Sequence, residues 1–226
     1  GKLAAPGEHR DWMVTHNPPL RPEIFAAARG EKTPAGRGRE AEDLVVAYLG
    51  VVSRHKGTHD FITAAARVAR KASRVRFIVA GGTMDARYEA TLRARVRRLQ
   101  LEDRLTFTGF LPDPIPVYRQ ADVVCLVSLY DEPFGMVVTE AMAFGKTVVA
   151  YDTGAVREIL QDGETGFIVP KGDPGALAAR ILSLARDREL GRRIGANARR
   201  EALARYNPAD YVRRIEELMA GVAADG

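Results

Sequence analysis

The chain has 226 residues, of which 46% are hydrophobic and 28% charged, and its net charge is +5. This composition is typical of a globular protein of one or two domains, and it excludes a spanning helix, because no apolar run approaches the required length of about 20 residues. A single cysteine, Cys125, permits no disulfide within the chain, and basic residues are not interleaved with aromatic ones, so nucleic acid is not an expected partner. Without a recognisable signal peptide, we expect a cytoplasmic protein, with peripheral membrane association of the full-length protein left open.

Residues 1–43 are predicted to form a linker without long regular elements, because prolines and glycines recur throughout them. We expect a short strand at 12–16, an extended connector at 17–25 and a solvated loop at 29–42. The chain begins with Gly1 instead of Met, which is expected of a piece trimmed from a longer protein. The linker would then enter the domain from a part of the protein that this sequence does not contain.

From Leu44 onward, apolar runs rich in β-branched residues alternate with segments of helical periodicity. The predicted strands span 44–50, 75–80, 105–108, 122–127, 147–150 and 166–169. The predicted helices span 58–71, 86–99, 114–120, 136–144, 156–160, 174–187, 189–205 and 209–219. The pattern indicates an α/β domain over 44–205 with a doubly wound, Rossmann-like parallel sheet, followed by a C-terminal helix within 206–226. Ligands of such sheets bind at the carboxyl ends of the strands.

The most informative stretch is the turn after the fourth predicted strand, which carries Glu132 and leads into the helix that carries Glu140. Unpaired amides at the helix start, from Phe134, Gly135, Met136 and Val137, would favour an anion. Carboxylates beside such a site suit hydroxyl groups better than phosphate. Phosphate held by amides and hydroxyls held by carboxylates suggest a nucleotide sugar, and the alternative is an ordinary helix start with solvated acids.

The turn after the first strand, residues 50–57, contains neither the dinucleotide-binding nor the P-loop glycine pattern. It places Arg54 and Lys56 at a strand end, where they would hold a diphosphate or, alternatively, would face solvent. His55 and His59 in the same region lack the additional ligands of a metal cluster, so we expect no metal.

Two further stretches are less specific. Gly109, Phe110 and Leu111 follow the third strand, and a nucleobase could lie against their backbone, although a tight turn explains them nearly as well. Five arginines make the second helix strongly basic, which is consistent with a solvated face or with a surface for a membrane or a partner: Arg87, Arg93, Arg95, Arg97 and Arg98.

The ordered set of motifs resembles the donor-binding C-terminal domain of a GT-B glycosyltransferase, and in particular the large retaining family 4, the glycosyl transferases group 1. The resemblance covers roughly residues 44–205, and it rests on glycine-containing turns that occur in the family's order around the E-x7-E motif. The motifs that carry it are 50–57, 77–82, 105–112, 118–122, 132–145, 148–154, 158–163, 165–170 and 172–174.

By this resemblance, Glu140 holds the ribose hydroxyls, Glu132 contacts the donor sugar, and Lys56 binds the diphosphate. The amides of Phe134, Gly135 and Met136 would face the sugar and the diphosphate. The family usually has an arginine directly after the glycine that ends the first strand, whereas this chain has Val51. Either Arg54 replaces that arginine, or the diphosphate is bound more weakly than usual.

The resemblance implies a retaining transfer of a hexose from a UDP-, GDP- or ADP-sugar, without another cofactor, to an acceptor held by an N-terminal domain absent from this chain. The isolated chain would then have little activity, and its last helix would pack toward the missing domain. Two alternatives remain: an epimerase or phosphorylase of nucleotide sugars with the same architecture, or a non-catalytic nucleotide-binding or interaction module.

Overall fold

The computed structural model describes residues 19–30 and 43–224. Within them, six parallel strands form one sheet in the order β3-β2-β1-β4-β5-β6. The strands are β1 (Leu44–Leu49), β2 (Val75–Ala80), β3 (Leu105–Gly109), β4 (Val123–Leu126), β5 (Thr147–Tyr151) and β6 (Phe167–Val169). The order reverses between β1 and β4, so the predicted doubly wound α/β fold is confirmed.

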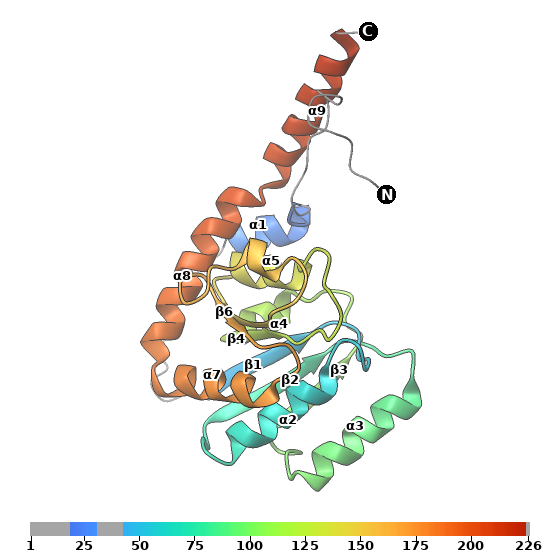
Figure 1. The fold of residues 1–226 in the computed structure, drawn as a ribbon, viewed down its shortest axis with the longest axis vertical. Coiled ribbons are helices and arrows are strands. Elements are labelled where there is room, and N and C mark those ends of the chain that lie inside the picture. Colours follow the sequence, from blue (N-terminus) through green and yellow to red (C-terminus); the bar gives the residue numbers. More distant parts are fainter. Residues whose placement is uncertain (1–18, 31–42, 225–226) are drawn as a thin grey trace.

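Helices cover both faces of the sheet (Figure 1). In chain order they are α1 (Pro22–Gly30), α2 (Thr58–Ala69), α3 (Ala86–Arg98), α4 (Ile115–Gln120), α5 (Met136–Ala143), α6 (Val156–Ile159), α7 (Pro174–Arg186), α8 (Arg188–Arg205) and α9 (Pro208–Ala224). One face packs against α2, α3 and α7, and the other against α1, α4, α5, α6 and the second half of α8. α9 projects away from the sheet (Figure 1), and its Val212 and Met219 are exposed.

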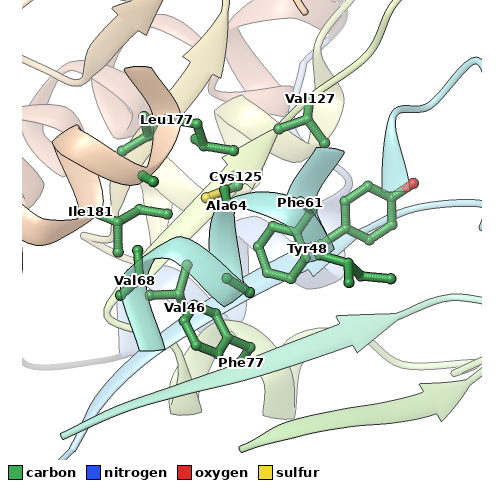
Figure 2. Close-up of a cluster of buried hydrophobic side chains, with 14 of the residues drawn as sticks. Val46, Tyr48, Phe61, Ala64, Val68, Phe77, Cys125, Val127, Leu177 and Ile181 are labelled. Atoms are coloured by element: carbon green, nitrogen blue, oxygen red, sulfur yellow. The ribbon is translucent and has the colours of Figure 1, made fainter. Parts of the chain in front are cut away.

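β1 has no solvent-facing residue, because both faces of the sheet are covered. Its residues point alternately to the two faces, and all six are buried because helices cover both sides. On the α2 side, Tyr48, Phe61 and Phe77 pack ring against ring, with centroids 5.8 and 6.1 Å apart (Figure 2). Cys125 is fully buried in the same cluster, and burial raises the pKa of its thiol, so it acts as a small apolar core residue.

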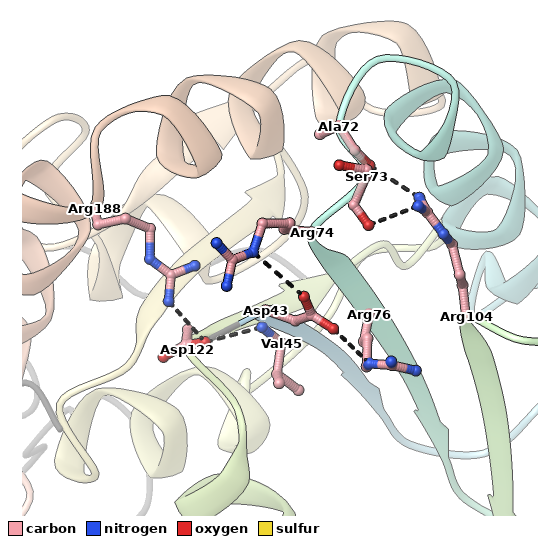
Figure 3. Close-up of polar contacts among 9 residues, drawn as sticks. All are labelled: Asp43, Val45, Ala72, Ser73, Arg74, Arg76, Arg104, Asp122 and Arg188. Carbon is pink, nitrogen blue, oxygen red and sulfur yellow. Dashed lines mark hydrogen bonds and ion pairs between the residues drawn. The ribbon is translucent and has the colours of Figure 1, made fainter. Parts of the chain in front are cut away.

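Polar contacts tie together the sheet edge where the strands begin (Figure 3). Asp43 pairs with Arg76 at 2.6 Å, and Asp122 accepts hydrogen bonds from the Val45 amide at 2.9 Å and from Arg188 at 3.2 Å. Since these residues lie at the edge opposite to the carboxyl ends of the strands, they stabilise the register and leave the other edge for a ligand.

The predicted elements of residues 44–219 are confirmed, with ends that shift by a few residues. The connector predicted at 17–25 is wrong from Pro22 onward, because α1 begins there. Proline suits the first position of a helix, and the buried Ile24 and Ala28 anchor α1 against the sheet layer, which outweighs the local signal for a break. The strand predicted at 12–16 and nearly all of the loop predicted at 29–42 lie outside the described residues.

Candidate functional site

Two loops meet where the strand order reverses: residues 50–57 after β1 and residues 127–135 after β4. Gly57 has a φ of +70°, and a Cβ on it would lie 1.9 Å from the carbonyl oxygen of Val127. The carbonyl of His55 accepts a hydrogen bond from the Leu129 amide at 2.8 Å. Only glycine permits this approach, which brings the two loops into direct contact.

The contact between the loops places a cation against a carboxylate. Lys56 Nζ lies 2.8 Å from Glu132 Oε2, and Ser128 Oγ donates to the same oxygen at 3.0 Å. Lys56 Nζ also lies 4.7 Å from the centroid of the Tyr130 ring. Burial alone would lower the pKa of Lys56, but its bonds to Glu132 and Tyr130 outweigh burial and raise it, so the ammonium stays charged.

A third loop, after β5, fixes the backbone of Glu132. The Ala155 amide donates to the Glu132 carbonyl at 2.9 Å, and Thr153 Oγ1 donates to the Tyr130 carbonyl at 2.7 Å. Gly154 has a φ of +49°, and a Cβ on it would lie 2.1 Å from the backbone carbonyl oxygen of Glu132. Glu132 is therefore held by three loops at the carboxyl edge of the sheet, its carboxylate by two of them and its backbone by the third.

The first turn of α5 borders this pair. Gly135 adopts a left-handed conformation before the helix and no side chain caps it, so the amides of Met136 and Val137 have no intrahelical partner. Phe134 is 53% exposed and Met136 is 39% exposed. The ligand contacts predicted for residues 134–137 remain a prediction, which this open helix start accommodates.

Glu140 lies further along α5 and is only 5% exposed. Its Oε1 accepts from Arg21 Nε at 2.9 Å, and its Oε2 accepts from the Tyr118 hydroxyl at 2.7 Å. Burial and the adjacent Glu140 charge raise the pKa of Tyr118 well above its usual range. Neither partner of Glu140 was predicted from the sequence, because Arg21 lies in the stretch expected to be a connector and Tyr118 only marked a short helix.

Arg54 and the residues after β3 take other positions. The guanidinium of Arg54 stacks over Tyr88 of α3, 4.7 Å from the ring centroid, whereas Lys56 of the same loop pairs with Glu132. Phe110 is 76% exposed beside Gly82, and Gly109 has a φ of +72° with open space around it. Of the predicted catalytic residues, the structure thus brings Lys56 and Glu132 together and directs Arg54 toward α3, while the roles predicted for Gly109, Phe110 and Leu111 stay predictions.

Residues 19–30 and 43–224 contain no group of three or more His, Cys, Asp or Glu side chains placed to hold a metal ion. No helix in the same ranges is long and apolar enough to cross a membrane.

A doubly wound sheet with an amide-lined helix start, a cation and two carboxylates at or beside its switch point defines a class of nucleotide-binding α/β domains. Comparison with known proteins makes the assignment specific: residues 31–201 match the family "Glycosyl transferases group 1". Because the match covers most of the chain, the chain belongs to this family.

Curated relatives carry the names of glycosyltransferases. The chain is 34% identical over 216 residues to the 2-deoxystreptamine N-acetyl-D-glucosaminyltransferase of Streptomyces fradiae, which covers 92% of this chain and 49% of the relative. It is 32% identical over 165 residues to the alpha-D-kanosaminyltransferase of Streptomyces kanamyceticus, which covers 72% of this chain and 42% of the relative. The chain therefore spans about half the length of these relatives.

Solved structures of other proteins share the fold of this chain. The Anabaena protein HepE in complex with UDP superposes with a TM-score of 0.75 at 29% identity, over 89% of this chain and 54% of HepE. The C-terminal domain of the glycosyl transferase group 1 family protein LpcC from Francisella tularensis superposes with a TM-score of 0.68 at 29% identity. That likeness covers 73% of this chain and 87% of the LpcC domain.

Proposed function

We propose that this chain is the donor-binding, C-terminal half of a retaining GT-B glycosyltransferase of family 4. It would hold a UDP-, GDP- or ADP-sugar whose hexose passes to an acceptor on an N-terminal domain outside this sequence. The substrate is the nucleotide sugar itself, and no further cofactor is invoked. A cytoplasmic location, with the full-length protein peripheral to a membrane, belongs to the same proposal.

The observation that carries this proposal is the Lys56–Glu132 pair at the switch point, 2.8 Å apart and next to the open start of α5. The pair offers a fixed positive charge and a carboxylate from two different loops, as a ligand with both phosphate and hydroxyl groups requires. HepE, which shares this fold, has been solved with UDP and with UDP-glucose, which supports a nucleotide sugar as that ligand.

In the proposed mechanism, Glu132 accepts a sugar hydroxyl, and the ammonium of Lys56 neutralises the diphosphate as the sugar–phosphate bond breaks. The amides of residues 134–137 would bind the same diphosphate. Glu140 would accept the ribose hydroxyls, and Arg21 and Tyr118 would orient its carboxylate. In this retaining transfer the acceptor oxygen attacks from the face on which the diphosphate leaves: its bond to the sugar carbon forms as the sugar–phosphate bond breaks, and the acceptor proton passes to the departing phosphate oxygen. A transfer of this kind needs no protein nucleophile.

The half-enzyme part of the proposal has separate support. The chain covers about half of its relatives but most of an isolated LpcC C-terminal domain, and the exposed residues of α9 offer a surface for a second domain. The isolated chain would therefore bind the donor and transfer sugar poorly, and transfer at the rate of a complete relative would contradict this.

Calorimetry with UDP, GDP and ADP tests donor binding on the chain as it is. One nucleotide should bind best, and Lys56→Met should weaken it about tenfold or more, because a charge-assisted contact to the diphosphate is lost. Lys171→Met is the matched control: Lys171 pairs with the exposed Asp131 at 3.0 Å in the same region, and its loss should leave the affinity unchanged.

Absence of heat with every nucleotide would instead favour the interaction module. Equal losses in Lys56→Met and Lys171→Met would show a general charge effect and contradict the assigned role of Lys56. Acceptor-independent products from the full-length protein and a nucleotide sugar would favour the epimerase or phosphorylase.

A further inference from the structure

A cavity lies beside the candidate donor site, between α2 and α3. These helices lie next to each other on the same face of the sheet (Figure 1). The cavity has a volume of about 870 Å³, within the range of small-molecule sites. Lys56, Glu132 and Glu140 are not among its lining residues, so it is distinct from the pair that carries the proposed donor site.

The lining of this cavity is cationic. Tyr88, Thr91 and apolar side chains line it together with three arginines and two histidines. The basic residues are Arg54, His55, His59, Arg95 and Arg98. None of the lining residues is acidic. Asp60, which follows the lining residue His59, is buried and is engaged by the Tyr151 hydroxyl at 3.0 Å and by His59 at 3.4 Å.

The arginines in the cavity are not neutralised within the described residues. Arg95 donates to Thr63 Oγ1 at 2.8 Å, yet its buried Nε has no hydrogen-bond partner there. Arg54 is stacked on Tyr88, and no ion pair with another described residue is recorded for Arg98. A buried donor without a partner is costly, so an anion that reaches Arg95 would remove that cost.

The basic residues of α3 therefore do not form one uniform face. Arg93 pairs with Glu89 at 2.7 Å and stacks on Phe107, 4.6 Å from the ring centroid. Arg97 is exposed and does not line the cavity, whereas Arg95 and Arg98 do. Two of the basic side chains of α3 therefore line a cavity, and Arg93 and Arg97 lie elsewhere on the helix surface.

We propose that the α2–α3 cavity binds a phosphate ester, with Arg95 and Arg98 as its anchors. Arginine offers paired donors that match phosphate oxygens. The Thr91 hydroxyl, by contrast, already donates to the Tyr88 carbonyl at 2.6 Å. Leu92 and Leu129 line the same cavity and suit the carbon body of a small phosphorylated molecule or of a lipid headgroup. A cavity of this volume is larger than a bare phosphate ion needs.

The test is titration of the ¹⁵N-labelled chain with sodium phosphate and with glycerol 3-phosphate, followed by amide shifts. We expect shifts in α2 and α3, and an affinity about tenfold or more lower in Arg95→Met/Arg98→Met. Arg97→Met, with the same loss of charge on the same helix, should bind as the unchanged chain does. Arg98→Met alone keeps the test valid if the double variant folds poorly, because Arg98 is exposed at the end of α3.

Vesicles of phosphatidylcholine, with and without an equal part of phosphatidylglycerol, distinguish the source of the phosphate. Cosedimentation only with phosphatidylglycerol and dependence on Arg95 and Arg98 would identify a lipid headgroup. Glycerol 3-phosphate binding without cosedimentation would identify a soluble ester.

Three results would overturn the site. One is the absence of binding both to the soluble phosphates and to the vesicles, and another is an equal loss of affinity in Arg97→Met. The third is displacement of glycerol 3-phosphate by saturating UDP with shifts confined to the loops around Lys56, which would place the phosphate in the donor site. Because Lys56→Met tests the donor site separately, failure of one site leaves the other intact.

Discussion

At the scale of single residues, the sugar-nucleotide proposal depends on how positive charge is distributed after β1. The side chain of Lys56 is 23% exposed and pairs with Glu132. Arg54 instead stacks on Tyr88 and lines the α2–α3 cavity. Val51, where the resembling family usually has arginine, is 51% exposed, and its carbonyl accepts from the Tyr48 hydroxyl at 2.7 Å. Lys56 would therefore be the one cation of this loop at the proposed diphosphate position, where the resembling family usually has both an arginine and a lysine.

A restored arginine should strengthen donor binding. Val51→Arg is expected to tighten the best-binding nucleotide diphosphate about tenfold, because an exposed position after β1 gains a charged donor toward the phosphates. Calorimetry at fixed salt measures the change, and Val51→Leu, which alters size without charge, is the control. An unchanged affinity in Val51→Arg would show that Arg54 already supplies this charge.

At the scale of elements, the site depends on loops that approach more closely than side chains allow. Gly57 against Val127 and Gly154 against Glu132 join three loops, so Lys56 and Glu132 meet although they are far apart in sequence. These contacts couple the stability of the sheet edge to the geometry of the site.

Gly57→Ala should therefore destabilise the chain by about 3 kcal/mol or more, since its Cβ would overlap a backbone carbonyl that cannot move independently of β4. Urea unfolding measures the change. Gly163→Ala is the matched control: Gly163 also has a positive φ, of +79°, but nothing lies within 4 Å of the added carbon, so only the conformational cost of about 1–2 kcal/mol applies. Equal losses in the two variants would mean that the loops adjust to the clash.

At the scale of the whole molecule, folding buries three tyrosines, and burial favours the protonated form of their hydroxyls. Burial raises the pKa of Tyr48, Tyr118 and Tyr151 above the usual value of 10.0, with the charges of Glu140 and Asp60 adding to the effect at Tyr118 and Tyr151. Above pH 10 the unfolded chain loses these protons while the folded chain keeps them. The unfolded state then binds fewer protons, so stability falls as the pH rises.

The free energy of unfolding should be insensitive to these groups below pH 9 and should fall above pH 10, by about 1.4 kcal/mol per pH unit for each such tyrosine. Urea midpoints across this range measure the slope. Tyr118→Phe should be less stable at neutral pH, because the bond to Glu140 is lost, but should show a shallower alkaline slope. An identical slope in Tyr118→Phe would contradict the assignment.

The sequence was sufficient to predict the class of fold, because apolar strands alternating with helical segments leave few arrangements other than a covered parallel sheet. It also determined the family, since glycine turns and the spacing of Glu132 and Glu140 are local features. It failed at α1, where prolines signalled a connector and burial of Ile24 and Ala28 made a helix. The partner of each charged side chain at the site became known only from the folded chain: Lys56 pairs with Glu132, Arg21 pairs with Glu140, and Arg54 stacks on the Tyr88 ring. Such pairings join residues up to 119 positions apart, and local spacing carries no information on contacts of that separation.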